Sequence, residues 1–332
     1  MTIEKIRVQN FTVFENIEME FANGINLLIG MNGTGKTHLL KAMYAISEGL
    51  GSNKKPSYTI AYPYFSVDGL NLIKDKENRS VPASLHVCYS NRIEAYYTIL
   101  ESSNAGLEDF VCNPENKKIK SIFIPAKEML SHSKGFLALN NKYEIPFDKT
   151  YVDILTNAEL PETREVSPLN EQLLKKLSKV IDGQVTHENG KFYVVKTKGD
   201  KVEFPIEAEG FRKFGLLWKL IRNGLLEDGT ILFWDEPEAN IDPERLPVLV
   251  DVLLELQRKG VQIFIATHSY NLAKYFEVKR GEQDEVLYHH LFKTEQGVKV
   301  ESNSYFGELT NNPIINADAK LLDEVIEGNF DD

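Results

Sequence analysis

Hydrophobic and polar residues follow two different periods along this chain, and the change of period predicts where strands give way to helices. Over residues 2–29 apolar positions alternate with polar ones in three runs, which predicts three short strands, the third more fully buried. Residues 33–49 carry a helical period that ends near Gly49. The apolar residues on one face of that helix are Leu39, Leu40, Met43 and Ile46.

The region after residue 205 alternates between the same two periods. Strands alternating with helices predict a parallel sheet joined by crossover helices. The predicted elements are a helix at 209–224, a strand at 230–234, a helix at 243–258, a strand at 261–266 and a helix at 269–277. Further strands are predicted after residue 283, followed by a last helix at about 317–327.

The middle of the chain has a weaker pattern. Residues 50–80 are rich in Lys, Asn, Pro and Gly and are predicted to be loop. The other predictions here are strands at 83–89, 94–100 and 119–124, an amphipathic helix at 168–183, and a hairpin over 191–206 that turns at 198–200. We therefore divide the chain into residues 1–49, an inserted lobe region at 50–204, and residues 205–332.

Composition narrows the classes of protein that fit this pattern. The 332 residues include 49 acidic and 38 basic ones, and the net charge of -11 argues against a surface that coats nucleic acid or anionic lipid indiscriminately. The basic clusters at 116–120 and 196–201 are interpreted as solvated loops.

Neither the cysteines nor the apolar runs point to a secreted or membrane protein. Cys88 and Cys112 are too few for a disulfide framework and lack metal-ligand spacing. No apolar run approaches the roughly 18 residues that cross a bilayer, and no secretory signal is visible. We therefore expect a cytoplasmic protein with no membrane partner.

The segment GMNGTGKT at 30–37 matches the phosphate-loop pattern G-x-x-x-x-G-K-[ST]. An apolar strand is predicted before it and an amphipathic helix after it, which is the context that the pattern requires. Its glycines allow backbone N–H groups to surround a phosphate at a helix N-terminus. Lys36 would add a positive charge for the β and γ phosphates, and the Thr37 hydroxyl would be a Mg²⁺ ligand.

Two further motifs end predicted strands of the same sheet. ILFWDEPEAN at 231–240 places Asp235 and Glu236 after four large apolar residues, where unpaired carboxylates are costly to bury. Next to a phosphate loop, Asp235 can hold the metal and Glu236 can polarise the attacking water. In FIATHS at 264–269 a predicted buried strand ends on His268, which can then hydrogen-bond the γ-phosphate or the water.

Together these segments resemble the ABC-type ATPase heads of the branch that holds the SMC, RecF and RecN proteins. The opening IEKIRVQNFTVFENIEMEFANGINLLIGMNGTGKT is similar to that branch in particular, and the resemblance covers residues 1–47 and 205–275. It implies an α/β P-loop NTPase fold: a RecA-like parallel sheet and a small antiparallel N-terminal sheet, with an inserted α+β region. Within that branch, the chain resembles the small stand-alone bacterial ATPases of phage-defence or toxin-like operons.

The resemblance also implies a role for each motif. It implies that ATP contacts Gly30, Asn32, Gly33, Thr34, Gly35, Lys36, Thr37 and His38, and that a second copy presents Glu209 and Gly210. It implies that Glu236, His268 and Lys36 are catalytic, that Thr37 and Asp235 bind Mg²⁺, and that Asn240, Ile241 and Asp242 form the D-loop. Such heads form homodimers with two ATP molecules between them.

Two motifs depart from the family pattern. The signature motif, usually Ser-x-Gly, best matches EAEGFRKFGLL at 207–217, where Ala208 or Glu209 replaces the serine. Arg212 or Lys213 could offset the charge of Glu209. The Q-loop glutamine has no convincing counterpart, and Lys127 and Glu128, which follow a strand in the right region, are interpreted as a surface turn.

Two functions remain open at this stage. The first is an ATP-gated module that hydrolyses ATP slowly and holds or releases a protein effector, such as a nuclease or toxin, in phage defence. The second is a repair ATPase that acts on DNA or RNA, as SMC and RecF relatives would suggest. The acidic balance and the absence of heptads long enough for coiled-coil arms favour the first, with nucleic acid or a phage component as its trigger.

Overall fold

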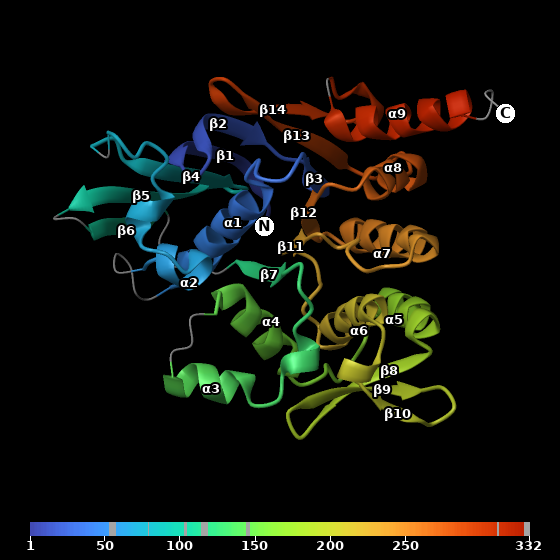
Figure 1. Cartoon of the computed structure of the whole chain (residues 1–332). Coiled ribbons are helices and arrows are strands. Elements are labelled where there is room, and N and C mark those ends of the chain that lie inside the picture. Colours follow the sequence, from blue (N-terminus) through green and yellow to red (C-terminus); the bar gives the residue numbers. More distant parts are fainter. Residues whose placement is uncertain are drawn as a thin grey trace.

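Two large sheets and one small sheet organise the chain (Figure 1). The computed structural model describes residues 1–52, 58–78, 80–102, 105–113, 119–143, 147–310 and 312–328. The central sheet has six strands, the N-terminal lobe has an antiparallel sheet of five, and a three-stranded sheet lies beside α6 (Glu209–Arg222).

The central sheet has the order β14-β13-β3-β12-β11-β7. All neighbouring pairs are parallel except β13 with β14. Its strands are β3 (Ile25–Ile29), β7 (Lys120–Ile124), β11 (Thr230–Asp235), β12 (Gln262–Thr267), β13 (Val286–Thr294) and β14 (Gly297–Asn303). Every residue of β3, β11 and β12 is buried, as expected for parallel strands that are covered on both faces.

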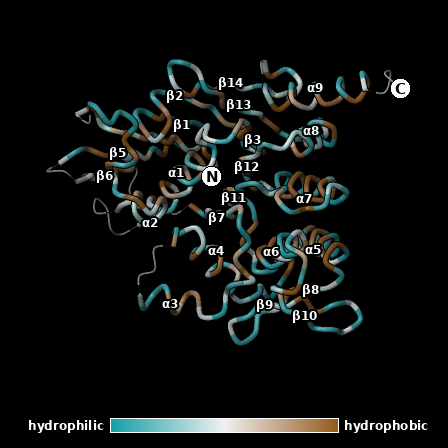
Figure 2. Tube along the Cα trace, in the orientation of Figure 1, coloured by the Kyte–Doolittle hydropathy of each residue, from teal (hydrophilic) through white to brown (hydrophobic). Residues whose placement is uncertain are grey.

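Two hydrophobic cores lie on opposite faces of this sheet. Because side chains alternate along a strand, Leu232 and Trp234 join one core while Ile231 and Phe233 join the other. The first core includes α6, α7 (Leu246–Arg258) and α8 (Tyr270–Lys279); the second includes α1 (Lys36–Leu50) and the N-terminal lobe. Hydrophobic and hydrophilic positions accordingly alternate along the trace of α7 (Figure 2).

The antiparallel sheet of the lobe has the order β2-β1-β4-β5-β6. Its strands are β1 (Ile3–Phe11), β2 (Phe14–Glu20), β4 (Ala83–Tyr89), β5 (Ile93–Ser102) and β6 (Ala105–Asn113). The sequence pattern missed β6, because this edge strand exposes Leu107 and Val111 on its outer face while Phe110 and Cys112 face the core. Apolar residues on both faces remove the alternation that marks a half-buried strand.

The remaining elements lie in the middle and at the end of the chain. The predicted hairpin is confirmed as β9 (Lys191–Lys196) and β10 (Lys201–Glu203), but β8 (Gly183–Glu188) also pairs with β9. The predicted loop at 50–80 contains a short helix, α2 (Ala61–Phe65), so that prediction was incomplete. The other helices are α3 (Phe136–Tyr143), α4 (Lys149–Glu159), α5 (Pro168–Ile181) and α9 (Pro313–Gly328).

The basic cluster at 196–201 lies in the β9–β10 hairpin, where Lys196 pairs with Glu207 and Lys201 with Glu188. This fits its interpretation as a solvated turn. Most of the cluster at 116–120 lies outside the described residues. None of the described helices combines the length and apolar character that a membrane span requires.

The predicted boundary of the lobe region runs through the central sheet. Strand β7 falls inside residues 50–204, yet it pairs with β11 in parallel. Strands β4 to β6 likewise complete a sheet that β1 and β2 begin. The division of the chain at residues 49 and 204 stays a prediction.

Candidate functional site

The phosphate loop connects the end of β3 to the start of α1. Gly33 and Gly35 have φ angles of +75° and +89°, which a residue with a side chain adopts with difficulty. A Cβ atom on Gly35 would also approach a ring carbon of Phe14 to 2.5 Å and a methyl carbon of Val13 to 2.6 Å. The loop therefore needs glycine both for its curvature and for its contact with the turn between β1 and β2.

Lys36, the first residue of α1, turns its ammonium group back into the loop. Its Nζ donates hydrogen bonds to the carbonyl oxygens of Gly30 and Met31, at 2.7 and 3.1 Å. Burial lowers the pKa of Lys36, while the negative charges of Glu236 and Asp235 act in the opposite direction. The cation is thus held where a phosphate would bind.

Thr37 and Asp235 meet although 198 residues separate them. The Thr37 hydroxyl lies 2.9 and 3.0 Å from the two carboxylate oxygens of Asp235. Burial is the main reason that the pKa of Asp235 rises to about 6, and the hydrogen bond from Thr37 opposes it. A hydroxyl and a buried carboxylate are hard oxygen ligands, so this pair fits Mg²⁺.

Glu236 directly follows the end of β11 in a strained backbone conformation. Its φ is +45°, in the left-handed region that costs a non-glycine residue about 1–3 kcal/mol. Its backbone N–H donates to the Ala266 carbonyl of β12 at 2.9 Å, which fixes the turn. His268 Nδ1 lies 3.2 Å from Glu236 Oε1, so the structure brings these two predicted residues together.

A hollow of about 200 Å³ lies between the phosphate loop and Glu236. It is lined by Val13, Asn32, Gly33, Gly35, Lys36, Thr37, His38 and Glu236. Val13 was not predicted, because an apolar residue in a hairpin turn carries no motif. Lys293 was also missed: its Nζ lies 3.3 Å from the position that a Cβ on Gly33 would occupy, which adds a second cation near the loop.

The start of α6 packs closely on the segment after Glu236. A Cβ on Gly210 would lie 2.7 Å from the Asn240 carbonyl oxygen, so this glycine permits the contact between α6 and the predicted D-loop. Lys213 Nζ donates a hydrogen bond to the Glu236 carbonyl oxygen at 2.9 Å. Its charge is therefore directed at the turn after β11 rather than at Glu209. Arg212 is the residue that can offset the charge of Glu209, because its guanidinium lies 3.9 Å from the Glu209 carboxylate.

The interpretation of Glu128 as part of a surface turn was wrong. Only 1% of its side chain is exposed, and its Oε2 lies 3.2 Å from Arg212 Nε on α6. Its Oε1 accepts hydrogen bonds from the backbone N–H groups of Leu130 and Ser131. Glu128 therefore joins the segment after β7 to the start of α6, a contact between distant segments that local sequence could not reveal.

Glu238 is a further buried acid that the sequence analysis did not single out. Burial raises its pKa, and the Thr267 hydroxyl, which donates to Glu238 Oε1 at 2.6 Å, opposes that rise. Thr267 immediately precedes His268, so this bond ties the end of β12 to the segment after β11. The repeated acid in DEPEAN was the available signal.

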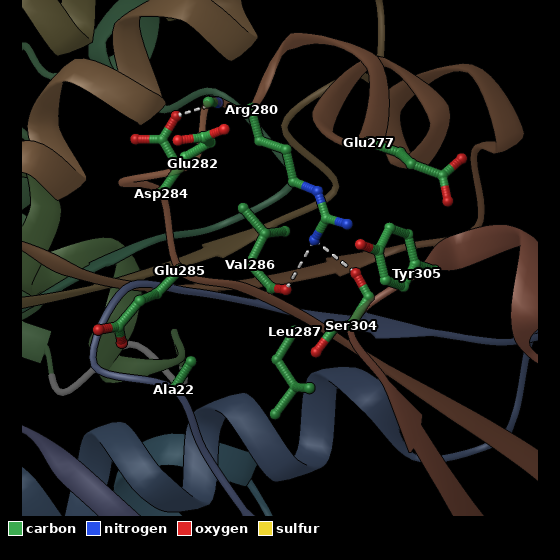
Figure 3. Close-up of a pocket in the computed structure, with 11 residues that line it drawn as sticks. Ala22, Glu277, Arg280, Glu282, Asp284, Glu285, Val286, Leu287, Ser304 and Tyr305 are labelled. Atoms are coloured by element: carbon green, nitrogen blue, oxygen red, sulfur yellow. Dashed lines mark hydrogen bonds between the residues drawn. The ribbon is translucent and has the colours of Figure 1, made fainter.

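A second hollow, of about 530 Å³, lies on a different edge of the sheet (Figure 3). It adjoins Val286 at the start of β13, whereas ligands of open α/β sheets bind beyond the carboxyl ends of the strands. Arg280, which points into it, donates to the carbonyl oxygens of Val286 and Ser304. We therefore place the candidate nucleotide site at the phosphate loop.

Comparison with known proteins identifies a family and several relatives to which the chain is similar. A family model described as "AAA domain" matches residues 5–182, just over half of the chain. A second, described as "AAA domain, putative AbiEii toxin, Type IV TA system", matches residues 118–274. The DNA replication and repair protein RecF of Cytophaga hutchinsonii is 39% identical over 72 residues, which are 21% of this chain and 19% of RecF. The match thus spans about a fifth of that relative's length.

Solved structures share the fold over almost the whole chain. An SMC head bound to the C-terminal winged-helix domain of ScpA superimposes with a TM-score of 0.62 at 13% identity, covering 92% of this chain and 99% of the other. The SMC head of Pyrococcus furiosus, bound to the C-terminal domain of ScpA, gives 0.59 at 12% identity, covering 98% and 99%. At such identities the likeness establishes the fold. The matching family model shows that this chain belongs to the AAA-domain family, and its fold is that of the SMC heads.

Proposed function

We propose that this chain binds ATP with Mg²⁺ between the phosphate loop and the acidic pair, and hydrolyses it. The observation that carries the proposal is the contact of Thr37 with Asp235, with Glu236 and Lys36 lining one hollow beside it. Residues from opposite ends of the sequence thus surround a space that suits a triphosphate. Thr37 and Asp235 would hold Mg²⁺, which would neutralise charge on the β and γ phosphates.

Each remaining residue then has a defined task. Lys36 and the backbone N–H groups of the loop bind the phosphates, and the positive end of the α1 dipole adds to their effect. Glu236 accepts a proton from the attacking water, and its strained backbone keeps the carboxylate aimed into the hollow. His268, 3.2 Å from that carboxylate, orients it and can donate to the γ-phosphate.

We propose that two copies close around two ATP molecules. The N-terminus of α6, with Glu209 and Gly210, would face the nucleotide of the second copy. Lys213 bonds to the Glu236 carbonyl oxygen, and Arg212 lies beside Glu128, so α6 is connected both to the catalytic turn and to β7. Closure could therefore depend on the nucleotide through these two contacts.

The closed dimer would gate a protein effector, such as a nuclease or toxin, in phage defence. Support comes from the family model described with a putative AbiEii toxin and from the net charge of -11. The second candidate is a RecF-like repair ATPase, which the 72-residue match to RecF favours. One comparison separates them: the ATPase rate with and without DNA or RNA, and co-purification with the product of a neighbouring gene.

The Glu236→Gln variant tests the nucleotide-dependent dimer. We expect it to bind ATP but to turn over at least about 100-fold more slowly, because the water loses its base. Its ATP-bound dimer should then accumulate, which light scattering after size exclusion with ATP and Mg²⁺ would measure against the 37.8 kDa monomer. Glu244→Gln, in the 3-10 turn before α7, is the matched control. A Glu236→Gln variant that stays monomeric with bound ATP would contradict the shared-nucleotide dimer.

A further inference from the structure

Three potential metal ligands meet on the outer face of the antiparallel lobe sheet, a face that the ATPase site does not use. They are His86 and Cys88 on β4 and Glu94 on β5, and one ligand atom from each lies within 4.8 Å of the other two. The sheet register explains the meeting: Cys88 is directly opposite Glu94, and His86 is two residues from Cys88, so all three side chains share one face.

Two of the three distances between these ligand atoms match those between the ligands of a tetrahedral zinc ion, and the third is within 4.8 Å. His86 Nε2 lies 3.4 Å from Cys88 Sγ and 3.5 Å from Glu94 Oε2. Bonds of about 2.0–2.3 Å at tetrahedral angles put neighbouring zinc ligands about 3.4–3.6 Å apart. One imidazole nitrogen carries either one proton or one lone pair, so it cannot bond fully to both neighbours. A cation between them would satisfy all three groups.

Tyr96 fixes two of the three ligands. Its ring stacks on the His86 ring, with centroids 4.1 Å apart and planes 10° from parallel. Its hydroxyl donates a hydrogen bond to Glu94 Oε2. Such outer contacts orient metal ligands before the ion binds. The arrangement is therefore more constrained than a chance group of surface side chains.

The nearby charges permit a divalent cation. Lys5 and Arg7 on β1 are opposite Cys88 and His86, and both form ion pairs with Glu18 of β2. Lys5 also lies 3.4 Å from Glu20. Thiolate and carboxylate together carry two negative charges, which balance the charge of Zn²⁺.

We propose that His86, Cys88 and Glu94 form a Zn²⁺ site. One sulfur, one nitrogen and one oxygen ligand suit this borderline-soft ion better than Mg²⁺ or Ca²⁺. Binding would displace the proton of the Cys88 thiol, and the neutral His86 would donate its Nε2 lone pair. Three protein ligands leave a fourth position for water. The proposal is independent of ATP binding.

The test is a Zn²⁺ titration of the whole chain against a chromophoric chelator, with Co²⁺ as a spectroscopic substitute. We expect one Zn²⁺ per chain and, with Co²⁺, a thiolate-to-metal charge-transfer band. Cys88→Ser should lose the band and weaken Zn²⁺ binding at least about tenfold. Cys112→Ser, which removes the buried cysteine of β6, is the matched control and should behave as wild type.

Two more variants distinguish the loss of a zinc ligand from misfolding of the chain. His86→Asn and Glu94→Gln keep the thiol and should each weaken Zn²⁺ binding with unchanged circular dichroism. Lys36→Ala should bind Zn²⁺ as the wild type does, because the phosphate loop takes no part. Equal Zn²⁺ affinity in wild type and Cys88→Ser, or no bound Zn²⁺ in the wild type, would overturn the proposal.

Discussion

The central sheet and the lobe sheet bring polar side chains together in different ways. In the central sheet, Thr37, Asp235 and Glu236 follow the ends of parallel strands and arrive from distant parts of the sequence. In the lobe sheet, His86, Cys88 and Glu94 are cross-strand neighbours within nine residues. The first arrangement buries charge at a sheet edge, whereas the second lies on a partly exposed face of its sheet.

The difference between the two sheets shows that the central sheet gives up folding stability to hold its site. Asp235 is buried with its pKa raised to about 6, and Glu236 has a left-handed backbone. Glu94, by contrast, has 46% of its side chain exposed. A divalent cation beside Asp235 would therefore relieve an electrostatic cost already present in the fold, whereas the half-exposed Glu94 presents no such cost to a cation at the lobe sheet.

Replacing Lys36 by alanine should have the largest effect. Its Nζ is held inside the phosphate loop by two carbonyl oxygens, so its removal takes the main positive charge from the site. We expect ATP affinity to fall about a thousandfold, or ~4 kcal/mol, by calorimetry. Lys191→Ala, in the β9 hairpin, is the control. Retained affinity in Lys36→Ala would mean that the loop does not bind the phosphates.

The next effect is expected from the buried ion pair of Arg212 and Glu128. Arg212→Ala leaves the Glu128 carboxylate buried without a cation, which should lower the free energy of unfolding by about 3 kcal/mol in urea. The double variant Arg212→Met, Glu128→Gln should recover most of this loss. On the lobe sheet, Arg7→Ala should leave the unfolding midpoint unchanged, since Arg7 is solvent-exposed. Equal losses of unfolding free energy in Arg212→Ala and Arg7→Ala would contradict the difference between buried and exposed ion pairs.

Asp235→Asn should stabilise the protein when Mg²⁺ is chelated. The folded-state pKa of about 6 lies above the ordinary value of 3.8, so the ionised carboxylate is disfavoured in the fold. Stability from this group is full below pH 3.8 and is lost as pH rises towards 6 and above. The variant should gain on the order of 2 kcal/mol at pH 7.5 and about half of that at pH 5.

The matched control for this prediction is Glu94→Gln on the lobe sheet. Its carboxylate is about half exposed, and the hydrogen bond from Tyr96 is the main reason that its pKa is lowered, so it is ionised at both pH values and any change in unfolding free energy should be small and equal at both. Thermal unfolding in a chelating buffer would measure both variants. A gain in Asp235→Asn that does not depend on pH would show that burial of charge is not its cause.

The smallest effect is expected at Gly210. An alanine Cβ would approach the Asn240 carbonyl oxygen to 2.7 Å, so the start of α6 must shift away from the D-loop. We expect a loss of about 1.5 kcal/mol in unfolding free energy and a weaker ATP-dependent dimer. Gly307→Ala, where φ is not positive and the nearest heavy atom would lie 3.9 Å from the new Cβ, controls for the general effect of the added methyl group.

The same contrast explains what the sequence could predict. The phosphate loop and the acidic pair are contiguous motifs at strand ends, and parallel topology brings strand ends together. Register across a hairpin is not visible in this way, so the spacing of Cys88 gave no hint of Glu94. Contacts between distant segments were equally hidden, and Glu128 was misjudged for that reason. Strand β6 was missed because its exposed apolar residues disguised its pattern.

The central claim is that the phosphate loop and the acidic pair bind one Mg²⁺–ATP together. Calorimetric titration with ATP, in Mg²⁺ or in chelator, tests it most directly on wild type, Thr37→Ala and Asp235→Asn. We expect Mg²⁺ to tighten ATP binding about tenfold or more in wild type and hardly at all in either variant. An undiminished Mg²⁺ effect in Asp235→Asn would contradict the claim.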